Sequence, residues 1–119
     1  MKDYLNIFKA LSDENRLRIL LMLKMRPLCV CEINEVLNIA LSTISAHLKL
    51  MKSIGLIEDE KEGRWVIYRL EKDNSFLHEL LEVLEKKLQN DQKVLNDRII
   101  ISQTTREICA LKLKEKQNI

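Results

Sequence analysis

Two cysteines, Cys29 and Cys31, are separated by a single valine and follow closely on the only proline of the chain, Pro27. Thiolates bind soft metal ions strongly, and the start of a helix stabilises the thiolate over the thiol. The apolar spacing over residues 28–37 predicts a short helix, which places both cysteines in its first turn. We therefore interpret the pair as a candidate site for a soft metal or metalloid ion.

The helix that carries the cysteines must be held by a small, mostly helical domain. A length of 119 residues is that of one domain with its own hydrophobic core. Only two glycines and one proline occur, and this scarcity of helix breakers favours a mainly α fold. The net charge of +2 is too small to indicate by itself that the domain binds nucleic acid.

Cysteine usage and hydropathy bear on where the protein acts. Three cysteines, an odd and sparse number, favour a reducing compartment in which neighbouring cysteines bind metal rather than form bridges. The first residues lack the apolar core of a signal peptide, and no apolar run is long enough to span a membrane. We therefore expect a cytoplasmic protein without a membrane partner.

Apolar periodicity predicts five helices and two strands within the first 90 residues. Helices are predicted over residues 3–11, 12–26, 28–37, 42–53 and 74–88, and strands over residues 56–60 and 64–70. Gly63 supplies the positive φ for a turn over Lys61, Glu62 and Gly63 between the strands. The helix at 74–88 carries a leucine stripe that we expect to pack on a second subunit. After Asp91 we expect one more helical stretch and a charged, frayed end.

The order of these elements predicts a winged helix-turn-helix. Two short helices joined by a tight turn and followed by a β-ribbon are its parts, and the second short helix enters the major groove of DNA. The predicted fold class is mainly α with a β-hairpin wing. In this interpretation residues 1–90 form the DNA-binding and dimerisation domain, and residues 91–119 form a C-terminal helical extension.

Four stretches of the chain resemble the ArsR/SmtB family of metal-sensing repressors. They are FKALSDENRLRILLML (8–23), LCVCEI (28–33), STISAHLKLMKSIGLI (42–57) and EGRWVIYRL (62–70). The resemblance implies a homodimer, joined through its N-terminal and fifth helices, that holds double-stranded operator DNA when metal-free. Binding of an ion then releases the DNA, and a resistance operon is transcribed.

The resemblance also implies a ligand set for the ion. Cys29 and Cys31 match the Cys-Val-Cys of the third-helix site that sensors of arsenite, antimonite, cadmium and lead use. Arsenite sensors of the enteric type have a third cysteine where this chain has Asn34. Arsenic(III) prefers three thiolates, so an added thiol, a second subunit or Cys109 must complete the coordination. The family's fifth-helix zinc site is expected to be absent, because its positions hold Asn74, Phe76, Lys87 and Asn90.

The chain lacks the N-terminal cysteines of the family's cadmium sensors, which favours As(III) or Sb(III) as the inducer over the alternatives Cd(II) and Pb(II). We expect no organic cofactor. We also expect no enzymatic activity. A thiol oxidoreductase would use Cys-x-x-Cys in a βαβ setting, and this chain has neither the motif nor that setting.

The helix at 42–53 matches the family's recognition helix. We expect it to contact DNA through Ser42, Thr43, Ser45, Ala46, His47, Lys49 and Lys52. For His47, a packing role is an equal alternative to base readout. In the wing, Arg64 is the residue expected to enter the minor groove. The family usually has Ser-Gln where this chain has Ala40 and Leu41, which removes a helix cap and a polar base reader.

Helix geometry suggests how ion binding acts. Residues i and i+2 of a regular α-helix point about 200° apart, so Cys29 and Cys31 are expected to share an ion only if the first turn is distorted or unwound. Unwinding would disturb the neighbouring recognition helix and release DNA. A thiol redox or persulfide sensor on the same scaffold is the alternative function, although such neighbours on a helix are poorly placed for a disulfide.

Overall fold

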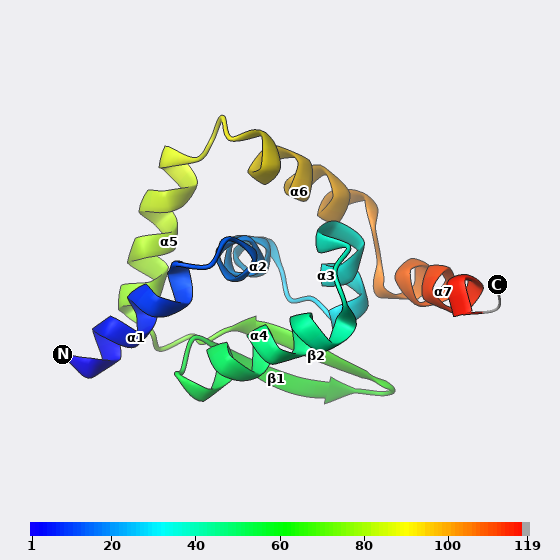
Figure 1. The fold of residues 1–119 in the computed structure, drawn as a ribbon, viewed down its shortest axis with the longest axis horizontal. Coiled ribbons are helices and arrows are strands. Elements are labelled where there is room, and N and C mark those ends of the chain that lie inside the picture. Colours follow the sequence, from blue (N-terminus) through cyan, green and yellow to red (C-terminus); the bar gives the residue numbers. More distant parts are fainter. Residues whose placement is uncertain (118–119) are drawn as a thin grey trace.

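The computed structural model describes residues 1–117, which fold into seven helices and one β-hairpin (Figure 1). In chain order the elements are α1 (Lys2–Leu11), α2 (Glu14–Met25), α3 (Val30–Leu37), α4 (Leu41–Ser53), β1 (Ile57–Glu62), β2 (Trp65–Leu70), α5 (Ser75–Lys87), α6 (Gln92–Gln103) and α7 (Arg106–Gln117). Every helix and strand predicted before residue 90 is present, although several ends are shifted.

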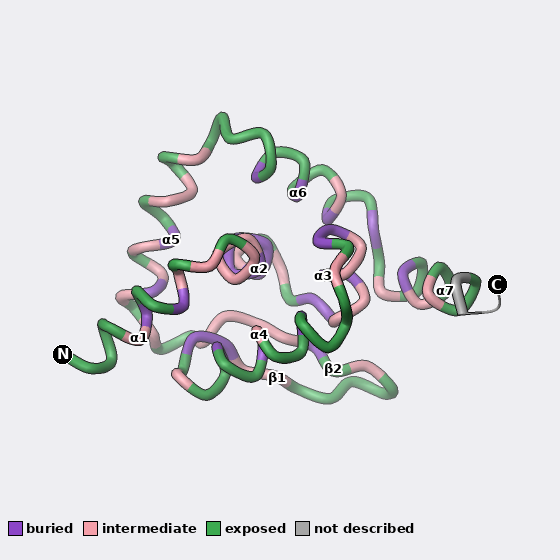
Figure 2. Tube along the Cα trace, viewed as in Figure 1, coloured by how far each residue is buried: buried purple, intermediate pink, exposed green. Residues whose placement is uncertain are grey.

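Helix α2 runs through the centre of the molecule and supplies much of its hydrophobic core (Figure 1). Its five consecutive residues from Ile19 to Leu23 are all buried, and α1, α5, α6 and β2 pack around it. The carboxylate of Asp13 caps its first turn by accepting the backbone N–H of Arg16 at 3.0 Å, which confirms the predicted cap. Figure 2 shows this buried centre, with exposed residues on the outer turns of α1, α5 and α6.

Helices α3 and α4 form the helix-turn-helix, and a short turn joins them. Asn38 ends α3 in the left-handed conformation, with φ 50°, which asparagine tolerates better than most residues. The side-chain amide of Asn34 donates a hydrogen bond to the Ile39 carbonyl at 2.6 Å and so fixes the turn. Helix α4 begins at Leu41, one residue before the predicted start, and its N-cap residue Ala40 offers no side-chain acceptor.

The wing is an antiparallel hairpin in which Glu62 lies opposite Trp65 at the tip. Its turn therefore consists of Gly63 and Arg64, which corrects the predicted three-residue turn over residues 61–63. Gly63 has a φ of 61°, as the sequence predicted for this position. The shorter turn leaves Arg64 exposed at the end of the wing.

The C-terminal extension forms two helices, α6 and α7, where a single helical stretch was predicted. The chain is extended at Thr104, and the hydroxyl of Thr105 then accepts the backbone N–H of Ile108 at 3.2 Å, starting a new helix. Helix α6 is fixed to α2 by a two-pronged ion pair between Arg18 and the buried Asp97, at 2.9 and 2.8 Å.

Helix α7 packs against α3. It continues to Gln117, so the predicted frayed end falls partly on residues 118–119, which lie outside the described residues. Among residues 1–117, none of the helices has the length and apolar character needed to cross a lipid bilayer.

Helix α1 contacts the start of α5 through aromatic rings, and both helices leave apolar side chains on the surface. The rings of Tyr4 and Phe8 pack edge-on against Phe76 of α5, with centroid distances of 4.9 and 6.1 Å. Despite these contacts, large apolar residues of both helices remain exposed, namely Tyr4, Leu5, Phe8 and Val83. None of these four belongs to the predicted leucine stripe. Leu77 and Leu81 of that stripe are buried in the core of this chain, and its other leucines are half-buried, so packing of the stripe on a second subunit stays a prediction.

Candidate metal centre and DNA-binding face

The two cysteines lie at the boundary of α3 rather than inside it. Helix α3 starts at Val30, two residues later than predicted, because Leu28 is paired with Tyr68 of β2 through two backbone hydrogen bonds of 3.0 and 2.8 Å. Cys29 is the N-cap residue and has an extended backbone, with φ −92° and ψ 169°. The sequence expectation of a regular helical turn through both cysteines is therefore wrong.

This backbone brings the two thiols together. The Sγ atoms of Cys29 and Cys31 are 3.0 Å apart, within hydrogen-bond contact. Cys29 is buried and Cys31 is half-buried. The chain at Cys29 already departs from the regular helix, so the sulfurs meet without further unwinding of the first turn.

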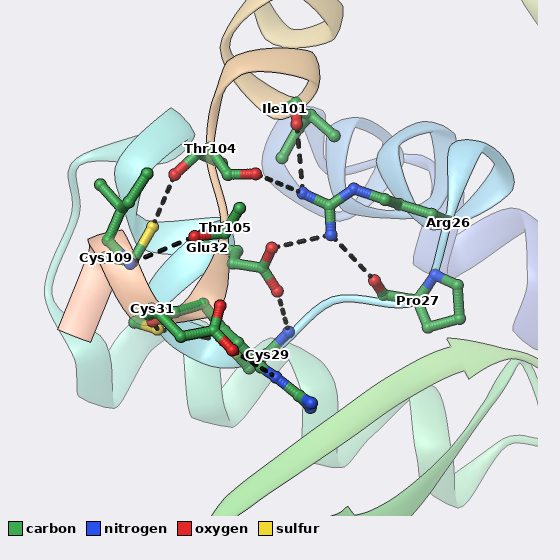
Figure 3. A network of polar contacts seen from close by, with 12 residues as sticks. Arg26, Pro27, Cys29, Cys31, Glu32, Ile101, Thr104, Thr105 and Cys109 are labelled. Atoms are coloured by element: carbon green, nitrogen blue, oxygen red, sulfur yellow. Dashed lines mark hydrogen bonds and ion pairs between the residues drawn. The ribbon is translucent and has the colours of Figure 1, made fainter.

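A buried carboxylate holds the start of α3. The backbone N–H of Cys29 donates to the Glu32 carboxylate at 3.0 Å, and the Glu32 backbone N–H in turn donates to the Cys29 sulfur, forming a capping box. Glu32 is only 3% exposed, and its charge is balanced by Arg26 at 2.7 Å. Arg26 also donates to the carbonyl oxygens of Ile101 and Thr104 at 3.1 and 3.0 Å (Figure 3). This network joins α2, α3 and the α6–α7 junction at the thiol pair.

The thiol pair holds its protons unequally. The pKa of Cys29 lies below its usual value because the Cys31 thiol donates a hydrogen bond to it and the Glu32 backbone N–H adds a second. The pKa of Cys31 is raised, because its proton is held in the hydrogen bond to Cys29 and burial disfavours a second negative charge beside the first. Cys29 is therefore the thiol of the pair that gives up its proton more readily.

Cys109 lies on α7, the helix that packs against α3, but its thiol is turned elsewhere. Its Sγ is 2.9 Å from the Thr104 hydroxyl (Figure 3), and burial raises its pKa. Helix α7 contacts the pair through the Arg106 carbonyl oxygen, which lies 3.8 Å from the Cys31 sulfur. Over residues 1–117, no three His, Cys, Asp or Glu side chains are grouped closely enough to hold a metal ion. A role for Cys109 as the third ligand stays a prediction.

Several residues of this site were missed by the sequence reasoning. Glu32 occupies the third position after a cap residue, which is the signature of a capping box, and this signal was available. Arg26, Thr104 and Arg106 carry no local signal, because each contacts the site from a distant part of the chain. Asn34, which replaces the enteric cysteine, serves the helix-turn-helix turn instead.

A groove of about 840 Å³ opens beside the thiol pair. Its walls are the start of α3, the start of α4, the beginning of β2 and one face of α7. The ring of Trp65 lies in this wall, with the guanidinium groups of Arg64 and Arg106 over it at 4.5 and 4.9 Å. Arg106 also pairs with Glu62 at 2.9 Å, so α7 is attached to the wing as well as to α3.

The recognition helix α4 presents most of the predicted DNA contacts to solvent. Its exposed members are Ser42, Thr43, Ser45, Ala46, Lys49 and Lys52. Lys52 is paired with Asp59 of β1 at 2.9 Å, and Arg64 is exposed at the tip of the wing. His47 is turned inward, with Nδ1 3.3 Å from Arg16 and Nε2 3.9 Å from Asp13. This geometry favours the packing role for His47.

A helix-turn-helix with an exposed second helix, followed by a β-hairpin wing, defines a winged helix-turn-helix DNA-binding regulator rather than an enzyme. Residues 13–59 match the family described as "Bacterial regulatory protein, arsR family". The chain belongs to this ArsR family, and its relatives support the same assignment.

The chain is 44% identical over 80 residues to the arsenic resistance transcriptional regulator ArsR2 of Pseudomonas putida, covering 66% of this chain and 70% of that protein. It is 37% identical over 81 residues to a cadmium resistance regulatory protein CadC homolog of Staphylococcus aureus, covering 67% of this chain but only 65% of that protein. Among solved structures, the homodimeric winged helix-turn-helix domain Mb0332 of Mycobacterium bovis is similar with a TM-score of 0.63 and 27% identity, covering 76% of this chain and 82% of that one.

Proposed function

We propose that the protein is a metalloid-responsive transcriptional repressor, which binds operator DNA as a homodimer and releases it when As(III) or Sb(III) binds Cys29 and Cys31. The observation that carries this proposal is the contact between the two sulfurs, 3.0 Å apart at the start of the helix that precedes the recognition helix. Relatives named for arsenic resistance support the choice of ion.

The protonation of the pair suits a soft trivalent ion. Cys29 is the sulfur that loses its proton and binds the ion first, and Cys31 gives up its proton when the ion takes the place of the hydrogen bond. A third ligand comes from an added thiol, from the second subunit, or from Cys109 after its side chain leaves Thr104. Cd(II) and Pb(II) remain alternative inducers, and a relative named for cadmium resistance supports keeping them.

Ion binding acts on the DNA-reading elements through the cap of α3. The sulfur of Cys29 accepts the Glu32 backbone N–H, and an ion on that sulfur competes with this hydrogen bond. The adjacent residue Leu28 is bonded to Tyr68 of the wing, while the other end of α3 is joined to α4 by the Asn34 hydrogen bond. Loss of the cap therefore shifts α3 relative to both DNA-reading elements, and operator affinity falls.

The operator is contacted by the exposed face of α4 and by the wing. The residues proposed to contact bases and phosphates are Ser42, Thr43, Ser45, Ala46, Lys49, Lys52 and Arg64, and His47 acts mainly as a brace against α2. The exposed apolar face of α1 and α5 forms the interface of the homodimer, which sets the spacing between the two recognition helices.

An operator-release titration tests the proposal. An operator duplex is first selected from a random-sequence pool with metal-free protein, and its release by arsenite, antimonite, cadmium, lead and zinc is then followed by fluorescence anisotropy. We expect arsenite and antimonite to release the wild type, and Cys29→Ser or Cys31→Ser to raise the half-release concentration by at least about tenfold, because thiolates bind soft ions far better than hydroxyls. Release that survives Cys31→Ser, or release by zinc alone, contradicts the proposal.

The Cys109→Ser variant tests which group supplies the third ligand of the ion. An unchanged arsenite response assigns the third position to an added thiol or to the second subunit, and a lost response assigns it to Cys109. Control experiments at matched salt are needed, because operator affinity depends steeply on salt concentration.

The sulfur contact also favours a second candidate function, a thiol redox sensor. Two thiols already in contact can be oxidised by hydrogen peroxide: both S–H bonds and the O–O bond break, one S–S bond forms, and two water molecules leave. Hydrogen peroxide added to the same titration tests this function. Operator release that dithiothreitol reverses supports it, whereas retention of DNA by the oxidant-treated protein rules it out.

A further inference from the structure

The groove beside the thiol pair is larger than a single ion requires, and most of its wall is apolar. At about 840 Å³ it has room for an organic group next to the two sulfurs. The apolar wall is contributed by four elements and consists mainly of Val30, Leu41, Trp65, Val66, Ala110 and Leu111. The charged residues that border the groove, such as Arg64, Glu107 and Lys114, are exposed to solvent.

The number of thiols at this site limits which arsenical it satisfies. Inorganic arsenite has three hydroxyl groups that thiolates can replace, whereas an arsenical with one organic group has only two, because the third valence is an As–C bond. Cys29 and Cys31 supply two sulfurs in contact, and the Cys109 thiol is held by Thr104. Inorganic arsenite bound to the pair alone would keep a hydroxyl and would leave the apolar wall of the groove uncovered.

We propose that the preferred ligand is a trivalent arsenical that carries one apolar organic group. Its arsenic bonds to Cys29 and Cys31, and its organic group lies in the groove against Trp65 and Leu111. This inference rests on the proposed function and names the chemical class of its inducer. In the reaction two As–O bonds and two S–H bonds break, two As–S bonds form, and two water molecules leave, with arsenic in the +3 state throughout.

The geometry supplies a reason for selectivity as well as for binding. Burying the organic group against the groove removes apolar surface from water, which stabilises the complex in proportion to the area covered. Helix α7 forms one side of the groove through Ala110 and Leu111, and it is anchored to the wing by Arg106 and to α3 by the ion pair of Lys112 with Glu35 at 2.6 Å. The organic group is therefore in contact with the segments that the thiol pair is proposed to move.

The only tryptophan of the chain makes this inference measurable without DNA. Trp65 lines the groove, so its fluorescence reports binding of phenylarsine oxide or sodium arsenite to the full-length protein. Phenylarsine oxide binds neighbouring thiols tightly in general, so the informative quantity is the ratio of its apparent affinity to that of arsenite. That ratio is compared between the wild type and variants of α7.

The test variant is Leu111→Glu, which puts a charge into the groove wall at a residue that is 63% exposed, so that folding is preserved. The matched control is Ile108→Glu on the same helix, at a residue that is 44% exposed and does not line the groove. We expect Leu111→Glu to lower the phenylarsine oxide to arsenite ratio by about tenfold, since the phenyl group loses its apolar contact, and Ile108→Glu to leave it unchanged. Ala110→Phe, which fills part of the groove and adds no second tryptophan, should lower the ratio in the same direction.

The outcomes separate this inference from the proposed function. If both reagents bind through Cys29 and Cys31 but the ratio is the same in the wild type, Leu111→Glu and Ala110→Phe, the groove has no role and the inference is overturned. It is also overturned if Cys109→Ser abolishes binding of phenylarsine oxide, because two thiols should suffice. If neither reagent binds, or both bind equally well to Cys29→Ser and Cys31→Ser, the proposed function itself is wrong.

Discussion

The buried charge nearest the thiol pair is the Glu32 carboxylate, and its position depends on one arginine. Arg26 reaches Glu32 at 2.7 Å and two carbonyl oxygens of the α6–α7 junction at 3.1 and 3.0 Å. A buried carboxylate without its cation is strongly unfavourable, because burial removes the water that would stabilise its charge. Arg26 therefore keeps the capping box of Cys29 and Glu32 in place, although it touches neither sulfur.

We expect Arg26→Ala to lower the free energy of unfolding by about 2 kcal/mol, less than the roughly 3–5 kcal/mol of a fully buried pair because the arginine side chain is partly exposed. Urea unfolding followed by circular dichroism measures this change. The control is Arg98→Ala, at an exposed residue of α6, which should alter the free energy by less than about 0.5 kcal/mol. Equal stability of the two variants would show that the Arg26 network contributes nothing.

At the scale of single elements, the sequence predicted the order and the type of every helix and strand before residue 90, because strong apolar periodicity determines both. It misplaced the start of α3, since the two hydrogen bonds between Leu28 and Tyr68 link residues far apart in the chain and leave no local pattern. For the same reason the sequence predicted a site at Cys29 and Cys31 but not the contact between their sulfur atoms. The break between α6 and α7 did have a signal, Thr105 as a cap with Glu107 in the first turn.

The attachment of α7 to the wing predicts a local effect of Arg106→Ala. The variant loses the ion pair with Glu62 and the contact with Trp65. Such contacts contribute little at exposed positions, so global stability should barely change. We expect backbone amides of α7 to exchange hydrogen several-fold faster, as measured by mass spectrometry, because local opening of the helix becomes easier. Unchanged exchange in α7 would mean that α3 alone holds this helix.

At the scale of the whole molecule, the exposed apolar residues of α1 and α5 are the feature that a single chain leaves unexplained. Large apolar side chains that are exposed in a single chain are typical of an interface. A two-fold dimer through this face would place two copies of α4 side by side to read two half-sites of an operator. The proposed repressor therefore requires association of two chains before it can bind its operator tightly.

We expect Val83→Asp to convert a dimer into a monomer in size-exclusion chromatography with light scattering, since it puts a charge into the proposed interface. The matched control is Ile99→Asp on α6, because Val83 and Ile99 are each 54% exposed. The control should remain dimeric. Dissociation by Ile99→Asp but not by Val83→Asp would place the interface on α6 instead.

The contact between Cys31 and the Arg106 carbonyl joins residues that are 75 positions apart in the chain. The elements that read DNA are complete once translation has passed β2, whereas the wall of the groove is added only with α7, the last helix described. A nonsense mutation at the α6–α7 junction would therefore leave a chain that still represses but responds poorly to the organic arsenical. When such a chain pairs with a full-length subunit, it would act as a dominant repressor. Late truncations of the gene would therefore be selected against wherever that ligand is toxic.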